Sequence, residues 1–179
     1  SHIKAIEFAK KNKYKNVVLF EDDFIFSKSK EEIDKLINKF LNKFKNNWDV
    51  LMLKCSYNDL KDINDFKDEG FKKVNWTTGA MGYIINNHYY DKLLNNFKKA
   101  TKKMEDEMKN YNYDKNGKKL ETGYALDQHW NSLQKKDKWY IFYPFIGNTK
   151  SSGSSIMNNK IEQFKEYFVN KIKIYNLYL

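Results

Sequence analysis

The stretch VVLFEDDFIF, from Val17 to Phe26, places three consecutive carboxylates between two runs of large apolar residues. A run such as VVLF, which has no alternating polar positions, is typical of a short strand buried on both faces of a parallel sheet. A solvated loop accounts for the acids but not for their apolar flanks, and a core strand accounts for the flanks but not for the acids. The pattern therefore predicts a buried strand that ends at Phe20, with the acids directly after it.

Helical and strand patterns alternate along the rest of the chain. Apolar residues recur at helical spacing in segments that we expect to be helices: 2–14, 27–46, 87–110, 124–136 and the tail from Lys160. Apolar or extended segments predict strands at 48–55 and 138–146, and at 70–86 on either side of a turn, TTGAMG. This alternation predicts a single α/β domain over residues 1–179, with a mostly parallel sheet sandwiched by helices.

The position of the acids suggests a binding site. Ligands gather at the carboxyl ends of the strands in such sheets, which is where Glu21, Asp22 and Asp23 fall. In an extended chain Glu21 and Asp23 point to one side and Asp22 to the other. Carboxylates held so close repel one another unless a cation neutralises them, and hard oxygen ligands suit magnesium or manganese. The alternatives are an acidic loop between strand and helix, or acids that stabilise a helix N-terminus.

Three further residues are candidates for the same site. In ALDQHW, Asp127 is a candidate base and His129 a candidate metal ligand, although an Asp before a helix often only caps it. Gly79 in TTGAMG lets the backbone approach a ligand closely. Cys55 is the only cysteine, so we expect a buried small residue rather than a disulfide or a nucleophile.

The charge of the chain restricts its partners. The net charge is +10, yet all 33 basic residues are Lys. Proteins that read base edges depend on bidentate Arg contacts, so we expect no nucleic-acid partner. The positive charge instead favours an anionic substrate. No stretch reaches the ~20 apolar residues of a membrane helix and the first residues do not resemble a signal peptide, so we expect no membrane span and a cytoplasmic location.

Taken in order, several motifs resemble glycosyltransferase family 25, which includes bacterial lipooligosaccharide galactosyltransferases and collagen hydroxylysine galactosyltransferases. Ser1 and His2 precede a helix, and a strand then ends in LFEDD. Further along the chain come the motifs WDVLML, TTGAMGYIINNHYYDKLL, ALDQHWNSL and YIFYPFIGNTKSSGSSI. The resemblance covers nearly the whole chain, to about Ile156.

This resemblance implies a GT-A-like fold and a metal-dependent, inverting transfer of galactose or glucose from a UDP-sugar to a hydroxyl of a glycan or hydroxylysine. It implies that Glu21–Asp23 occupy an Asp-x-Asp-like site for manganese (or magnesium) and the UDP-sugar, and that Asp127 is the base. Ser154–Ile156 depart from the family's Ser-Asp-Ile, so a carboxylate is missing there. The family's uridine pocket lies in strands before Ser-His, where this sequence starts, so we expect a fold truncated at its N-terminus.

Two other classes of protein fit parts of the sequence. A non-catalytic relative would keep the fold as an interaction or acceptor-binding module, and would not respond to UDP-sugars. A basic nucleic-acid binder would bind polyanions in a salt-sensitive manner without any response to manganese. Manganese-dependent release of UDP distinguishes the transferase from both.

Overall fold

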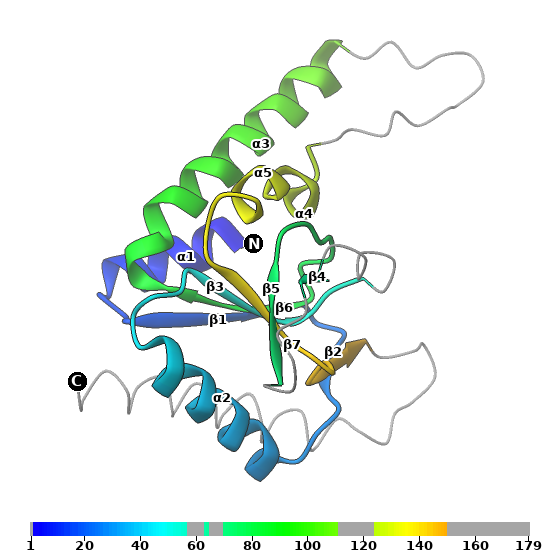
Figure 1. Ribbon diagram of the computed structural model, residues 1–179. Helices are drawn as coiled ribbons and strands as arrows, with labels where there is room; N and C mark the ends of the chain where they lie inside the picture. Colours follow the sequence, from blue (N-terminus) through cyan, green and yellow to red (C-terminus); the bar gives the residue numbers. More distant parts are fainter. Residues whose placement is uncertain (1, 57–62, 65–69, 111–123, 150–179) are drawn as a thin grey trace.

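A six-stranded sheet runs through the molecule, with helices on both of its faces (Figure 1). The computed structural model describes residues 2–56, 63–64, 70–110 and 124–149. The order of the strands across the sheet is β1-β6-β3-β7-β5-β4. Their bounds are β1 Asn16–Phe20, β3 Val50–Lys54, β4 Ile63–Asn64, β5 Phe71–Val74, β6 Gly82–Asn86 and β7 Trp139–Phe142.

The strand directions correct part of the predicted fold. The α/β class is confirmed, but β3 and β7 form the one parallel pair and the other neighbours in this sheet are antiparallel. The prediction of a mostly parallel sheet is therefore wrong. An apolar run such as VVLF indicates burial on both faces, and helices on both sides of an antiparallel sheet bury a strand equally well.

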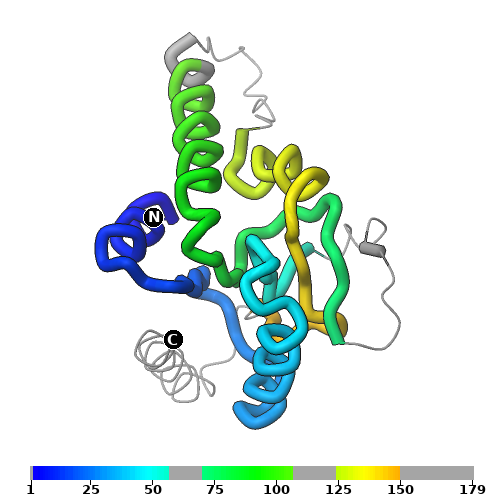
Figure 2. The backbone as a smooth tube through the Cα atoms, turned by 60° about the vertical axis from the view of Figure 1, so that its left-hand side comes forward, coloured from blue at the N-terminus to red at the C-terminus, as the bar shows by residue number. Residues whose placement is uncertain are grey.

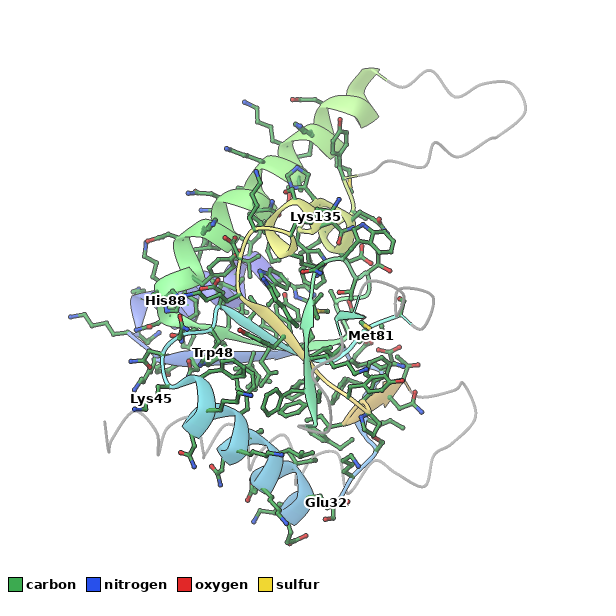
Figure 3. All side chains as sticks on the ribbon, in the orientation of Figure 1. Glu32, Lys45, Trp48, Met81, His88 and Lys135 are labelled. Carbon is green, nitrogen blue, oxygen red and sulfur yellow. The ribbon has the colours of Figure 1, made fainter. Side chains whose placement is uncertain are left out.

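Three strands nevertheless end at the same edge. β1 and β3 both run antiparallel to β6, so they share one direction, and β7 is parallel to β3. Gly82, at the start of β6, pairs with Phe20 on one side and with Lys54 on the other. The segment after Phe20 therefore lies at the edge where β3 and β7 also end. In Figure 3 the labelled Met81 lies at this end, and Trp48 and His88 at the opposite end.

Helices cover the two faces separately. α1 (His2–Lys11) lies beside α3 (Tyr90–Asn110) on one face in both Figure 1 and Figure 2, and α2 (Lys30–Phe44) covers the other face. The remaining helical segments are short: η2 Asn87–Tyr89, α4 Leu126–His129 and α5 Asn131–Gln134. These elements confirm the helices expected in the described residues. The helix expected from Lys160 lies outside them.

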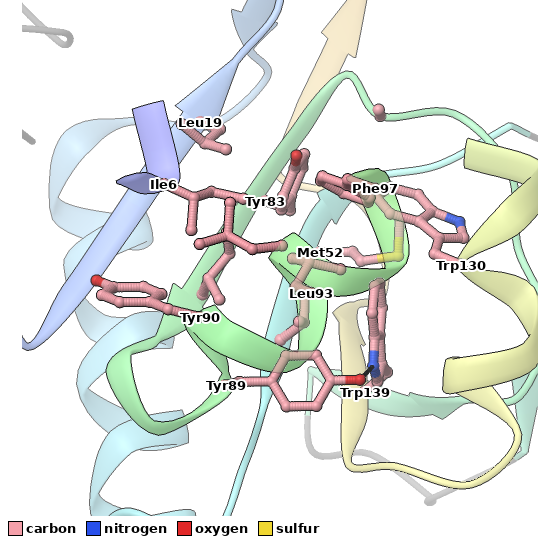
Figure 4. Packing of buried hydrophobic residues seen from close by; sticks show 14 of the residues in the cluster. Ile6, Leu19, Met52, Tyr83, Tyr89, Tyr90, Leu93, Phe97, Trp130 and Trp139 are labelled. Atoms are coloured by element: carbon pink, nitrogen blue, oxygen red, sulfur yellow. Dashed lines mark hydrogen bonds between the residues drawn. The ribbon is translucent and has the colours of Figure 1, made fainter. Parts of the chain in front are cut away.

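Each helical layer has a sequence reason. α2 begins with a capping box, in which the Glu32 N–H donates to Ser29 Oγ (3.2 Å) and the Ser29 N–H donates to Glu32 Oε2 (2.9 Å). On the other face, large aromatic and aliphatic side chains from the sheet, α1, α3 and the α4–α5 segment form one cluster, shown in Figure 4.

Within the described part of the chain, no helix combines the length and apolar character that a bilayer span requires.

A small second sheet sits beside the first. β2 (Phe24–Phe26) pairs antiparallel with β8 (Gly147–Thr149). The Phe24 ring is buried and occupies the space where a Cβ at either of two glycines would lie, 2.6 Å away for Gly82 and 2.2 Å away for Gly147. This packing ties β2, and the acidic loop before it, to strands of both sheets.

Candidate functional site

The acidic loop Glu21–Asp23 is a tight connection between β1 in the large sheet and β2 in the small one. The Glu21 N–H donates to Met81 O (2.9 Å), and the Phe24 N–H donates to Glu21 O (3.2 Å). The Phe20 and Phe24 rings on either side of the loop are 4.7 Å apart. The apolar flanks therefore belong to two different strands, and the acids form the turn between them.

Negative charges gather around Glu21. Partial burial and then the charges of Asp23, Asp127 and Asp22 raise the pKa of Glu21 above its ordinary value of 4.5. Asp127 is more than 100 positions away along the chain, so the fold brings the acidic loop and α4 close together. Asp22 and Asp23 form no hydrogen bond or ion pair with any residue that the structure describes. No cation of the described residues therefore offsets the repulsion on Asp22 or Asp23.

His2 and Tyr83 complete one side of this site. Tyr83 is fully buried in β6, and its hydroxyl shares a hydrogen bond with His2 Nδ1 (2.7 Å). His2 Nε2 lies 4.0 Å from Glu21 Oε1. Burial, and next the charge of Glu21, raise the pKa of Tyr83 well above its usual range, so the phenol stays neutral. Tyr83 was not predicted as a site residue; the sequence signal for it is a polar aromatic in an otherwise apolar strand.

Asp127 is held by the turn that precedes β6. The Gly79 N–H donates to Asp127 Oδ2 (2.9 Å). The residue that caps α4 is Ala125, without a side-chain hydrogen bond, so the alternative that Asp127 caps its own helix is wrong. Gly79 has a left-handed φ of +87°, and a Cβ there would lie 2.4 Å from Met81 Cε and 2.9 Å from Ser56 Oγ. The close backbone approach expected at Gly79 is therefore made with its own chain.

The structure does not bring His129 together with Glu21 and Asp23. Burial and then the charges of Lys103 and Lys99 on α3 lower the pKa of His129, and its ring lies 6.3 Å from that of Tyr124. Asp127 and His129 are two positions apart on a helical turn, about 200° around its axis, so their side chains leave α4 on different sides. His129 thus faces the lysines of α3.

The loop carboxylates suit a hard divalent cation. Manganese and magnesium prefer carboxylate oxygens and keep several positions for water and for the phosphates of a substrate. Among the residues that the structure describes, no group of three or more His, Cys, Asp or Glu side chains has metal-binding geometry. Glu21 and Asp23 would by themselves supply only part of a coordination shell, and the remaining positions would need oxygens from water or a ligand.

Comparisons with known proteins do not add a family assignment. No protein-family model matches the chain, and no curated protein matches its sequence. The acidic loop, Gly79, Tyr83 and Asp127 therefore carry the functional argument.

Proposed function

We propose that the chain is a metal-dependent inverting glycosyltransferase of the GT-A type, which moves galactose or glucose from a UDP-sugar to a hydroxyl of a glycan or hydroxylysine. The observation that carries this proposal is the convergence of the acidic loop and Asp127 at the carboxyl end of β1. The motifs that resemble glycosyltransferase family 25 supply these same residues in the same order along the chain.

Glu21 and Asp23 are the proposed ligands of manganese or magnesium, with Asp22 beside them at the donor. A divalent ion at this position supplies neutralisation of the diphosphate leaving group as its charge develops. The loop itself is held in place by its bond to Met81 O and by the buried Phe24 ring. A loop backbone that is already held in place needs less reorganisation to bind a cation, which favours electrostatic stabilisation of a transition state.

Asp127 is the proposed base. One of its oxygens, Oδ2, accepts the Gly79 N–H, while Oδ1 has no partner among the residues that the structure describes. An inverting transfer needs a group that takes the proton of the acceptor hydroxyl as this oxygen attacks the anomeric carbon. The bond to Gly79 orients the carboxylate and leaves Oδ1 for that proton.

The test is manganese-dependent release of UDP from a panel of UDP-sugars, with glycan and hydroxylysine acceptors. We expect UDP release from UDP-glucose or UDP-galactose. A chelator should abolish this release, and so should Asp23→Ala. A matched control is Asp91→Asn, which removes an exposed carboxylate on α3. A folded protein that neither binds nor hydrolyses any UDP-sugar in manganese contradicts the transferase and favours the non-catalytic interaction module.

A further inference from the structure

The turn that holds Asp127 has no regular secondary structure of its own. Residues 75–81 connect β5 to β6, and within them Thr77 is fully buried. A buried backbone without a sheet or helix partner must find its hydrogen bonds elsewhere. The residues that provide those bonds decide where the turn lies, and with it the Gly79 N–H that Asp127 accepts.

Side chains of the α4–α5 segment provide the hydrogen bonds of Thr77, while Thr78 O accepts the Ser56 N–H (3.1 Å). The Thr77 N–H donates to Gln134 Oε1 (2.6 Å), and Trp130 Nε1 donates to Thr77 O (3.0 Å). Gln134 Nε2 donates to Thr77 Oγ1 (3.0 Å), which in turn donates to Met52 Sδ (3.2 Å). Trp130 and Gln134 are both fully buried. Every polar group of Thr77 is therefore bonded inside the core; Figure 4 shows Trp130 beside Met52.

Asp127 belongs to the same face of this segment. Asp127, Trp130 and Gln134 are spaced three and then four positions apart, and Trp130, between α4 and α5, also has helical backbone angles. This spacing puts three side chains on one helical face. They bond in turn to Gly79 N, Thr77 O and Thr77 N, so the face runs along the backbone of the turn.

The turn also reaches the acidic loop, because Met81 O accepts the Glu21 N–H (2.9 Å). It is thus the piece of backbone that links the two carboxylate-bearing segments. We propose that Gln134 and Trp130 are positioning residues, which fix the 77–79 backbone against α4–α5 and thereby set where Asp127 stands relative to Glu21–Asp23. The role in catalysis rests on the proposed function; the positioning itself does not.

The test uses Gln134→Met, which keeps most of the side-chain bulk and removes the amide hydrogen bonds to Thr77 and Met52. The second variant is Trp130→Phe, which removes the donor to Thr77 O together with part of the buried ring. The first readout is the chemical shift of the Gly79 amide proton in the full chain. Asp127→Ala gives the reference shift of this amide without its carboxylate acceptor. We expect both variants to move this resonance toward that of Asp127→Ala. If Gln134→Met does not fold, Trp130→Phe decides alone.

The second readout is transfer. A misplaced base should lower kcat by about 10- to 100-fold, with the KM for the donor little changed. The matched control is Asn86→Leu, because Asn86 is also buried and donates to a backbone carbonyl, Trp48 O (3.2 Å), at the opposite end of the sheet. It should lose stability without moving the Gly79 resonance. A Gly79 resonance unchanged in folded Gln134→Met and Trp130→Phe overturns the proposal, whether or not the chain transfers sugar.

Discussion

Carboxylates lie at both ends of the central sheet, but their surroundings differ. At the end where β3 and β7 begin, Asp49 pairs with His88 Nε2 (2.7 Å) and accepts the Lys138 N–H (2.7 Å). Asp137 accepts the Tyr89 hydroxyl (2.6 Å) and Lys92 Nζ (2.6 Å). Asp49 and Asp137 therefore each have a donor on both of their carboxylate oxygens.

At the other end, the acids mainly face one another. The charges of Asp22, Asp23 and Asp127 all act on Glu21. Among the described residues, the contacts of these four side chains with other groups are the Gly79 N–H bond to Asp127 and His2 Nε2, 4.0 Å from Glu21 Oε1. At the end of Asp49 and Asp137, in contrast, nearby His, Lys and Tyr side chains donate to the carboxylates. In the part of the chain that the structure describes, the acids of the 21–23 loop therefore lack the donors that Asp49 and Asp137 have.

The largest expected effect is at the end of the sheet where the acidic loop and Asp127 lie. Asp127→Asn should lower the transfer rate by about 10²–10⁴-fold, because the amide cannot take the acceptor proton. Its side-chain oxygen can still accept the Gly79 N–H, so the free energy of unfolding should stay close to that of the wild type. Steady-state transfer assays and urea denaturation measure the two quantities. Transfer at a near wild-type rate would remove Asp127 as the base.

A smaller effect is expected at the paired end. Asp137→Ala should lower the free energy of unfolding by about 1–3 kcal/mol, because the buried Tyr89 hydroxyl loses its acceptor. Manganese-dependent UDP binding should be unchanged. Urea denaturation and calorimetry check these outcomes, and the same change in a Tyr89→Phe background should cost less. An equal cost in both backgrounds would mean that the Tyr89 bond is not the source of the stability.

The stability of the fold should change with the opposite sign when an acid of the 21–23 loop is neutralised. Asp23→Asn should raise the free energy of unfolding by roughly 0.5 kcal/mol in the absence of metal, because it removes a repelling charge from the cluster. The same variant should lose metal-dependent UDP binding. Thermal melts without metal test the change in stability, and melts with manganese and UDP test the loss of metal-dependent UDP binding. A variant that melts below the wild type without metal would show that Asp23 is a stabilising acid like Asp137.

The smallest effect is a dependence on pH. Because the pKa of Glu21 is raised, the folded state holds this proton more tightly than the unfolded chain does. Ionised Glu21 therefore lowers the free energy of unfolding. This loss is absent below the ordinary pKa of 4.5 and grows as the pH rises from there through the raised pKa of the folded state. Melting wild type and Glu21→Gln across this range should show the variant gaining relative stability as the pH rises. A difference independent of pH would contradict this account.

Much of this arrangement could be predicted from local patterns. The Ser caps before residue 30, the apolar helix faces and the buried runs at 17–20 and 50–53 are each determined by near neighbours in sequence. The proximity of Glu21–Asp23, Gly79 and Asp127 was expected from the family resemblance and from the position of the acids at the end of a buried strand. Strand direction was not predictable, because an apolar run carries no information about which neighbour it pairs with.

The supporting contacts of the site were also missed. Thr77 and Gln134 carry no local signal, since a Thr in a turn and a Gln in a short helix are ordinary surface residues. Their burial depends on partners 57 positions apart. His129 was misjudged as a neighbour of the acids because its spacing from Asp127 in sequence says nothing about the side of α4 from which it projects, a side occupied by α3 lysines.

The Phe24 ring, seated over Gly82 and Gly147, has a consequence for how this sequence can vary among related proteins. An alanine at either glycine would collide with the ring, so a change at 82 or 147 is tolerated only together with a smaller residue at 24. The three positions should therefore substitute as a set. A smaller residue at position 24 would weaken the packing of β2 against both sheets, and with it the position of the carboxylates of Glu21–Asp23 just before it. Selection that keeps β2 in place would therefore extend to the two glycines against which the Phe24 ring packs.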